Sequence, residues 1–351
     1  MAGQDAFKNS DRILTIAVPA FNSASWLSSC LDSLLLPDVG NDLEVIIVND
    51  GSTDATRQIA EQYVVAHPET FRLIDQENGG YGAAVSSGLA AASGRYFYVL
   101  DSDDRVDSAA MLKLLAEISS DLAATQDVDL YITNTVYENT FRGKSRRMHF
   151  RGMIPAGLIF SWEAVRFTSP SKFLSFHCLT YNTDLLRTAD IVLPRHTSYV
   201  DNLLAWLPLP ACRRLRYLDL DLYRYSIGRS DQSINPRILV SRIDQHLAIN
   251  WQMIECMDFS DPRISPALRR YLLHYLAMIC AISTIHLALA GTVEAELKRR
   301  DFWSRIRESR PQLYRRLRYR LTVWPVNLPG RFGRFIARCF YRLTRHFYHF
   351  A

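Results

Sequence analysis

The sequence lacks the cysteine patterns of a disulfide-bonded or zinc-binding protein. Its six cysteines are scattered over 351 residues and form no CxxC pair. Most of them lie among apolar neighbours, which indicates reduced thiols in a protein core. Low-complexity segments are also missing, and 48% of the residues are hydrophobic. We therefore expect a globular protein with a large core and one or two domains.

Two further absences narrow the class of protein. Residues 1–12 are polar and contain no apolar h-region, so we expect a cytoplasmic chain without a signal peptide. The chain also has no GxGxxG motif after its first apolar run, and no glycine turn follows that run. Because both features are typical of dinucleotide-binding folds, we do not expect a dinucleotide cofactor.

Positive charge is concentrated at one end of the chain. The net charge is +5, but residues 298–351 hold one Lys, fourteen Arg, one Asp and one Glu, which leaves the other 297 residues at −8. This distribution indicates that the tail meets an anionic surface. From Val323 onward, aromatics and arginines at helical spacing predict an amphipathic helix on anionic lipid. A solvated or packed pair of arginine-rich helices is the alternative, and no motif supports nucleic-acid binding.

The first half of the chain alternates strand and helix patterns. Short apolar runs predict strands at 13–18, 43–48, 71–74 and 96–100, and apolar residues at helical spacing lie between them. Strands separated by about 25 to 30 residues with intervening helices form βαβ units, which imply a mainly parallel sheet. Ligands bind at the carboxyl ends of the strands in such sheets.

The second half has a different pattern. Segments 130–132 and 215–225 predict strands, 200–207 predicts a short helix, and the chain after Asn235 is predominantly helical. Residues 272–290 are uncharged apart from two histidines. A membrane span is compatible with that length, but the polar residues within the segment favour a buried helix.

Polar motifs follow the four predicted strands at the points where those strands end. The last motif crowds three carboxylates, which repel one another unless a cation lies among them. Hard carboxylate oxygens suit Mg²⁺ or Mn²⁺, whereas a simple helix cap is better supplied by Asp107. The motifs are Pro19-Ala20-Phe21-Asn22, Val48-Asn49-Asp50-Gly51-Ser52-Thr53-Asp54, Glu77-Asn78-Gly79-Gly80 and Leu100-Asp101-Ser102-Asp103-Asp104.

In order and spacing these motifs resemble those of the family 2 glycosyltransferases, which are inverting enzymes with a GT-A fold. The resemblance covers about residues 13–107 and extends more weakly to 228–233. It implies an α/β fold of GT-A type, a Rossmann-like and mainly parallel sheet with flanking helices, followed by a helical C-terminal region. We expect the following division: a GT-A domain over 1–235, with a nucleotide-sugar half at 13–127 and an acceptor half at 128–235, and a helical region with a basic tail over 236–351.

The resemblance also implies a donor site. Asp101 and Asp103 look like the DxD pair of the family, which holds Mg²⁺ or Mn²⁺ against the diphosphate of the donor, most often a UDP-sugar. Asp50 would accept a hydrogen bond from the N3–H of uracil, although an Asx-turn would use the same segment. Gln76 departs from the lysine expected there. The nucleotide-sugar contacts implied in this way are Pro19, Phe21, Asn22, Asp50, Asn78, Gly79, Gly80, Asp101, Ser102 and Arg229.

Two further assignments carry alternatives. Arg229 would pair with the diphosphate through its guanidinium, or else form a surface ion pair. Inversion requires a general base, and Asp201 is the best match to the family's base, with Val200 in place of the usual Glu. A helix cap is the alternative for Asp201, and His177 and His196 are rival bases.

The predicted function is one inverting transfer per acceptor. The acceptor would be a hydroxyl of a cell-surface polysaccharide or a lipid-linked glycan, and the QxxRW motif that accompanies processive synthesis in the family is absent. The basic tail at 298–351 predicts peripheral contact with the inner face of an anionic membrane. The alternative is a non-catalytic module on the same fold that binds sugar nucleotides or glycans.

Overall fold

The structure is a computed structural model, and it describes residues 12–139, 143–166, 172–229, 232, 235–328, 335–337 and 339. Its contacts divide the chain into two compact units, Met1–Arg166 with Leu174–Ser226, and Phe167–Phe173 with Ile227–Ala351.

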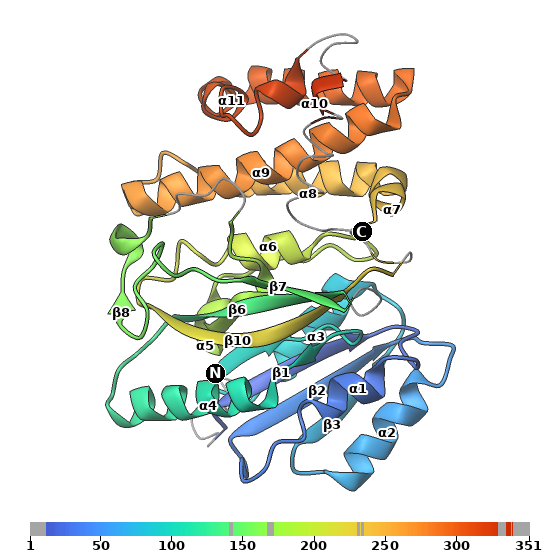
Figure 1. Cartoon of the computed structure of the whole chain (residues 1–351), viewed down its shortest axis with the longest axis vertical. Coiled ribbons are helices and arrows are strands. Elements are labelled where there is room, and N and C mark those ends of the chain that lie inside the picture. Colours follow the sequence, from blue (N-terminus) through green and yellow to red (C-terminus); the bar gives the residue numbers. More distant parts are fainter. Residues whose placement is uncertain are drawn as a thin grey trace, which may run out of the picture. The chain divides into compact units, whose positions relative to one another are not determined.

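The first unit is built on the parallel sheet that the sequence predicts (Figure 1). Strand β1 (Leu14–Ala20) lies between β2 (Leu43–Asp50) and β4 (Tyr96–Val99), and β3 (Phe71–Gln76) lies outside β2. All three pairings are parallel. Every residue of β1, β2 and β4 is buried, because helices cover both faces of a parallel sheet and the usual alternation of polar and apolar residues is lost.

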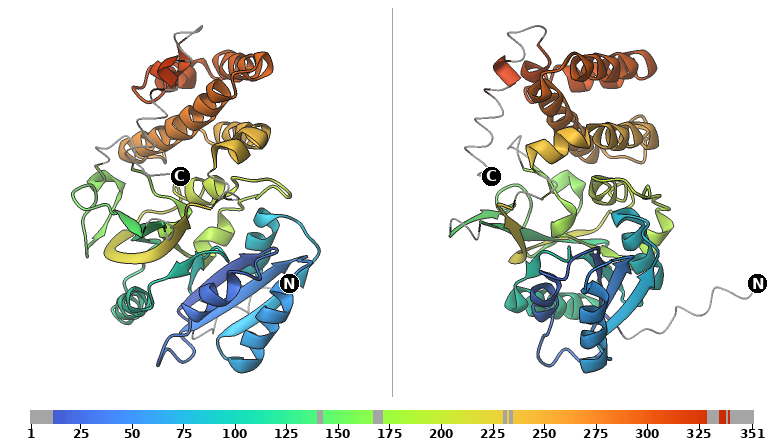
Figure 2. Two further views of the ribbon diagram at one scale, coloured as in Figure 1. Left: turned by 45° about the vertical axis from the view of Figure 1, so that its right-hand side comes forward. Right: turned by 90° about the vertical axis from the view of Figure 1, so that its right-hand side faces the viewer.

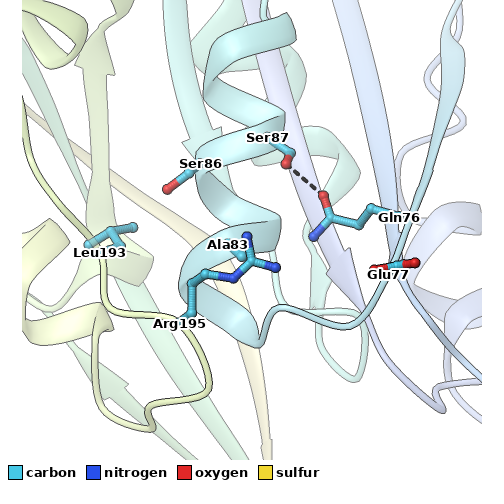
Figure 3. A pocket seen from close by; sticks show the side chains of 7 residues that line it. All are labelled: Gln76, Glu77, Ala83, Ser86, Ser87, Leu193 and Arg195. Carbon is cyan, nitrogen blue, oxygen red and sulfur yellow. Dashed lines mark hydrogen bonds between the residues drawn. The ribbon is translucent and has the colours of Figure 1, made fainter.

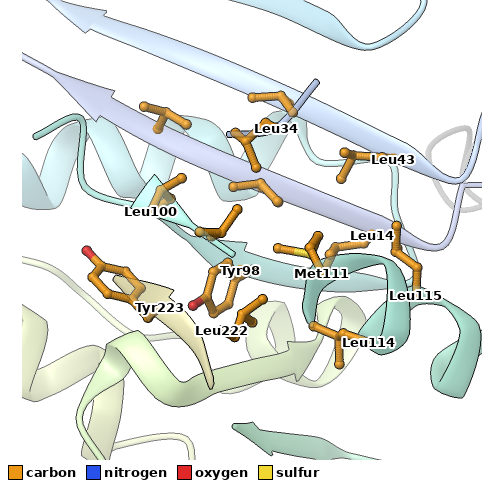
Figure 4. Packing of buried hydrophobic residues seen from close by; sticks show 14 of the residues in the cluster. Leu14, Leu34, Leu43, Tyr98, Leu100, Met111, Leu114, Leu115, Leu222 and Tyr223 are labelled. Atoms are coloured by element: carbon orange, nitrogen blue, oxygen red, sulfur yellow. The ribbon is translucent and has the colours of Figure 1, made fainter. Parts of the chain in front are cut away.

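Helices connect these strands and form the core with them. Helix α3 packs so closely on β1 that a Cβ atom at Gly88 would lie 2.7 Å from the Cβ of Ala17. The predicted cap at Asp107 is confirmed, because its carboxylate accepts a hydrogen bond from the backbone N–H of Ala110 at 2.9 Å. Met111 of α4 is buried with Tyr98 in the main core cluster (Figure 4). The helices are α1 (Leu27–Asp32), α2 (Thr56–Ala66), α3 (Tyr81–Ala91) and α4 (Ser108–Ala123).

An antiparallel half extends the same sheet, in the order β3-β2-β1-β4-β9-β6-β10-β5. Strand β9 pairs antiparallel with both β4 and β6, and β10 pairs antiparallel with β5 and β8. The sheet is therefore mixed, with its parallel strands at one side. The further elements of this unit are β5 (Arg105–Val106), β6 (Leu130–Asn139), β7 (Lys144–Met148), β8 (Ile159–Phe160), β9 (Leu179–Asn182), β10 (Leu215–Ile227), α5 (Thr183–Thr188), α6 (Asp201–Trp206) and the 3₁₀ helices η1 (Trp162–Ala164) and η2 (Phe176–Cys178).

The second unit is helical, as predicted, and its central element is α9 (Figure 2). This helix is capped by Ser265 and ends at Gly291, whose φ of 70° suits glycine. It is long and apolar enough to cross a membrane, yet 83% of its most apolar stretch is buried within the protein. The elements are α7 (Pro236–Ser241), α8 (Ile243–Cys256), α9 (Pro266–Ala290), α10 (Val293–Ser309), α11 (Pro311–Arg318) and η3 (Pro325–Asn327).

The basic tail differs from its prediction in the part that is described. No continuous helix starts at Val323, because residues 321–324 form a turn and η3 follows. Pro325 lacks the backbone N–H that a continuing helix needs. Most of the predicted tail helix lies outside the described residues, including Phe332, Phe340, Tyr341 and the arginines from Arg331 onward.

A buried histidine in the second unit makes its stability depend on pH. The ring of His246 is buried on α8, with Nδ1 2.6 Å from Oγ of Ser283 on α9. Burial, with a smaller contribution from His286, lowers the pKa of His246 to about 3. Between pH 6.5 and 3 the unfolded chain, in which a histidine has a pKa of about 6.5, therefore binds more protons than the folded chain. The stability that the neutral, buried ring contributes is complete above pH 6.5 and is lost as the pH falls. From pH 7.5 to 5.5 we expect a loss of about 1.4 kcal/mol in unfolding free energy, measured by urea titration. A His246→Gln variant should not show this loss of unfolding free energy, and an equal loss in that variant would contradict the assignment of the pH dependence to His246.

Candidate active site

The polar motifs gather at one edge of the parallel strands, as their positions predict. Asn22 bridges the loops after β1 and β2, because its backbone N–H donates to Oγ of Ser52 at 3.0 Å and its side chain accepts from the N–H of Thr53 at 2.9 Å. The loops after β1 and β4 meet where Oγ of Ser23 lies 2.7 Å from Oγ of Ser102. Three chain segments far apart in sequence thus form one connected rim.

Asp50 ties this rim to the glycine turn that precedes α3. Its carboxylate accepts hydrogen bonds from the N–H groups of Gly79 and Gly80 at 2.9 and 2.8 Å, and from Nε2 of Gln76 at 2.7 Å. Gly80 has a φ of 83°, and a Cβ atom there would lie 2.7 Å from the backbone nitrogen of His196. Only glycine fits this position without strain. The buried carboxylate therefore shapes the turn directly, a role that the sequence did not suggest.

Gln76 also borders a pocket of about 410 Å³ beside α3 (Figure 3). Its Oε1 accepts a hydrogen bond from the hydroxyl of Ser87 at 2.6 Å, so one amide links the pocket wall to Asp50. Arg195 reaches the same region from a loop more than a hundred residues away, and a Cβ atom at Gly79 would lie 2.7 Å from its Nη2. Sequence analysis missed Arg195, because no local pattern marks a loop arginine that packs on a distant turn. The lining residues are Gln76, Glu77, Ala83, Ser86, Ser87, Leu193 and Arg195.

Carboxylates and one imidazole cluster after β4. Ligand atoms of Asp101, Asp104 and His177 all lie within 4.8 Å of one another, and Nε2 of His177 is 3.7 Å from Oδ2 of Asp101. This group differs in its second carboxylate from the predicted pair of Asp101 and Asp103. Sequence analysis predicted His177 only as a rival base. The 3₁₀ helix η2 places it beside the acidic motif, although His177 and Asp101 are 76 positions apart in the sequence.

The cluster concentrates carboxylates around one buried side chain. Asp104 is 3% exposed and accepts hydrogen bonds from Oη of Tyr223 at 2.7 Å and from the N–H of Ser226 at 2.8 Å. Burial, followed by the charges of Asp103 and Asp101, raises the pKa of Asp104 well above its ordinary value. A bound cation would relieve that repulsion, and the hard oxygen donors present fit Mg²⁺ or Mn²⁺.

Tyr81 orients the first carboxylate of this cluster. Its hydroxyl donates to Oδ1 of Asp101 at 2.8 Å from the first turn of α3. Burial, then the charge of Asp101 and the hydrogen bond to it, raises the pKa of Tyr81, so the phenol stays a donor at neutral pH. The glycine turn and the acidic motif are therefore connected through one side chain.

The predicted base lies within electrostatic reach of the cluster. Asp201 is the first residue of α6, directly after Val200, and its carboxylate accepts hydrogen bonds from the backbone N–H groups of Asp201 and Asn202 at the start of that helix. Its role as base remains a prediction. Burial raises the pKa of Asp201 to about 6, His177 lowers it, and the charge of Asp101 raises it. The rival base His196 is exposed, and its backbone N–H donates to the carbonyl of Gly79.

Arg229 belongs to the second unit, whereas the other predicted site residues belong to the first. Its backbone N–H and that of Gly228 donate to Oε1 of Gln232 at 3.2 and 3.0 Å. A diphosphate contact for Arg229 remains a prediction.

Sequence comparison identifies relatives for the first half of the chain. Residues 15–184 match the model of the family "Glycosyl transferase family 2". The chain is similar to the uncharacterized glycosyltransferase EpsJ of Bacillus subtilis, 39% identical over 105 residues, which are 30% of each chain. It is also similar to the chondroitin synthase of Escherichia coli, 36% identical over 111 residues, which are 32% of this chain and 16% of that protein. The matches thus cover less than a third of the length of these relatives.

Structural comparison extends the likeness to nearly the whole chain. Residues 1–349 of Staphylococcus aureus TarS, in complex with UDP-GlcNAc, superpose with a TM-score of 0.65 at 18% identity, over 96% of this chain and 91% of that one. The mannosyltransferase PcManGT of Pyrobaculum calidifontis, in complex with GDP-Man and Mn²⁺, gives 0.54 at 17% identity, over 94% and 86%. At these identities the likeness concerns the fold, and the predicted fold class is confirmed.

Proposed function

We propose, from the match of residues 15–184 to the model of glycosyl transferase family 2, that the chain transfers a sugar from a nucleotide donor to an acceptor hydroxyl with inversion. One observation carries the proposal. The rim of Asn22 and Asp50, the cluster of Asp101, Asp104 and His177, and the carboxylate of Asp201 are linked by hydrogen bonds or charge in one unit. A donor, its leaving group and a base for the acceptor each have a plausible place there.

We propose a UDP-sugar as the donor. Pro19 lies near the end of β1, Phe21 and Asn22 follow that strand, and Phe21 is 51% exposed at the rim, which suits contact with a flat base. Hydrogen bonds from Gly79, Gly80 and Gln76 leave one acceptor position on the Asp50 carboxylate, and that position would accept a hydrogen bond from the base. The backbone of Asn78, Gly79 and Gly80 and the hydroxyl of Ser102 complete the proposed donor contacts of the first unit.

We propose Mg²⁺ or Mn²⁺ as the cofactor, held by Asp101 and Asp103, with Asp104 and His177 close by. When bound, the cation would offset the negative charge that builds on the leaving nucleoside diphosphate. The chain itself fixes the first carboxylate, because Tyr81 donates to Asp101. The mannosyltransferase neighbour that was solved with Mn²⁺ supports this choice of ion.

Asp201 is the proposed general base. It would take the proton of the acceptor hydroxyl while that oxygen attacks the anomeric carbon, and no covalent intermediate on the enzyme is needed for inversion. Its raised pKa makes it a stronger base than an exposed aspartate while leaving it largely ionised at neutral pH.

The acceptor and the location are also proposals. The similarity to a chondroitin synthase supports a polysaccharide or lipid-linked glycan acceptor at the cytoplasmic, inner face of a membrane. The first unit would hold the donor and acceptor halves, and the helical unit would supply the membrane contact. A non-catalytic sugar-nucleotide-binding module is the second candidate, and the complete carboxylate cluster favours the enzyme over it.

The deciding experiment is a panel of nucleotide sugars, assayed for slow hydrolysis with Mn²⁺ and with EDTA. We expect cleavage of a UDP-sugar that requires the metal. Tight binding of a nucleotide sugar without any cleavage would favour the non-catalytic module, and cleavage that EDTA does not affect would contradict the metal assignment.

The pH profile provides a further prediction. Because a protonated Asp201 cannot accept a proton, kcat/KM should fall about tenfold per pH unit below pH 6 and level off above it. A bound cation near Asp101 would move this acid limb to lower pH, never to higher pH. Initial rates from pH 4.5 to 8.5 at low acceptor concentration measure this pH dependence of kcat/KM. A fall in kcat/KM that begins above pH 7 would indicate a histidine as the base instead.

A further inference from the structure

We propose that the surface formed by Arg315, Arg316, Tyr319, Leu321 and Trp324, here called the α11 surface, binds an anionic phospholipid bilayer. The proposal deepens the suggested location at a membrane and rests on it, but it does not depend on the chemistry of sugar transfer. It concerns only the second unit.

Helix α11 presents its charged side to solvent. Leu313 and Leu317 are buried, four residues apart on one face, whereas Arg315 and Arg316 are exposed. Tyr319 follows directly after the helix, four residues beyond Arg315 and three beyond Arg316. At this spacing the tyrosine lies beside both arginines. The helix therefore uses its apolar face for packing and leaves a basic face with an aromatic edge.

The turn after α11 adds exposed apolar side chains to that edge. Tyr319 is 69% exposed, Leu321 85% and Trp324 47%, while Val323 is buried between the last two. The backbone N–H of Trp324 donates to the carbonyl of Arg320 at 2.8 Å, so Leu321 and Trp324 share one helical turn. A leucine with two amphipathic aromatics is the set that enters the headgroup region of a bilayer.

The charge of this segment calls for an anionic partner. Residues 310–328 contain five arginines and no acidic residue. On α10, by contrast, Arg299 and Arg300 pair with Glu296 at 2.8 and 2.9 Å. Arg315 and Arg316 form no ion pair with any acid in the described part of the chain. Because exposed leucine and tryptophan gain little from a phosphate backbone but gain from acyl chains, lipid fits this surface better than nucleic acid.

Vesicle binding of the full chain tests the proposal. Co-sedimentation with vesicles containing phosphatidylglycerol should be strong and should weaken with salt, while pure phosphatidylcholine vesicles should bind far less. Leu321→Ser with Trp324→Ser should weaken binding by about tenfold or more, and Arg315→Gln with Arg316→Gln should do so by about tenfold and reduce the salt dependence. Val293 and Leu297 on α10 are also exposed apolar residues, at 79% and 60%, so Val293→Ser with Leu297→Ser is the matched control and should bind normally.

Binding that survives both α11 double variants, or that the control variant loses equally, would overturn the proposal. Retention on DNA without binding to anionic vesicles would overturn it too. Because the substituted side chains are exposed, thermal unfolding should match that of the native chain. UDP-sugar hydrolysis measured without vesicles should also be unchanged in the α11 variants, so a failure of the membrane proposal and a failure of the proposed chemistry are read from different assays.

Discussion

Replacing Asp101 by asparagine should lower metal-dependent sugar transfer by about 10³-fold or more, because an ion at this carboxylate is expected to supply several kcal/mol of transition-state stabilisation. The substitution removes one of three crowded negative charges and keeps an acceptor for the hydroxyl of Tyr81. The fold should therefore remain as stable as before or become more stable. Transfer rates at saturating Mn²⁺, with Mn²⁺ binding in the presence of UDP followed by electron paramagnetic resonance, measure the effect.

Two comparisons sharpen this result. Asp103→Ala should be as inactive as the Asp101 variant if the predicted pair holds the ion, whereas loss of Mn²⁺ binding in His177→Ala with retention in Asp103→Ala would assign the site to the clustered group instead. Tyr81→Phe removes only the hydroxyl that orients Asp101 and should cost about tenfold. Full activity of the Asp101 variant would contradict the metal proposal altogether.

The second large effect is expected at Asp201. Asp201→Asn should reduce turnover by about 10² to 10⁴-fold, since the amide cannot accept the proton of the attacking hydroxyl. Binding of UDP should be unchanged, because the proposed nucleotide contacts lie at the rim of Asn22 and Asp50. Single-turnover transfer and UDP titration separate the two quantities.

Matched variants identify the base. His196→Gln, in the exposed loop over Gly80, should leave the pH profile in place even if it lowers the rate. His177→Gln should change the acid limb, because His177 lowers the pKa of Asp201. If Asp201→Asn turns over normally, the role of base moves to one of these histidines.

Local patterns predicted the parallel half of the sheet. The apolar runs before Pro19, Asn49 and Asp101 are short and continuous, and they became β1, β2 and β4. A strand that is buried on both faces can be recognised from such a run alone. Because the carboxyl ends of parallel strands share one edge of the sheet, the order of the motifs along the chain was enough to place these motifs together. The cap at Asp107 was predictable for the same reason, since capping depends on four consecutive residues.

Contacts across long sequence separations were not predictable. His177 reaches Asp101 over 76 positions, Arg195 reaches Gly79 over more than a hundred, and Tyr223 donates to Asp104 over 119. Each depends on how the antiparallel strands β9 and β10 continue the sheet, and periodicity in one segment does not encode its distant neighbours. The predicted tail helix shows the converse error. The helical spacing of its aromatics and arginines was given more weight than Pro325, which lacks the backbone N–H that a continuing helix needs.

The sequence by itself determined the fold class, the rim around Asp50 and the acidic motif at Asp101, because these follow from residue order within βαβ units. Only the tertiary structure decided which side chains complete the acidic motif, what holds Asp50, and that Asp201 lies within reach of His177 and Asp101. The physical reason is that charges and hydrogen bonds act through space. Their effects on the pKa of Asp104 and of Asp201 exist only once the folded chain has desolvated each carboxylate and brought Asp101 near it.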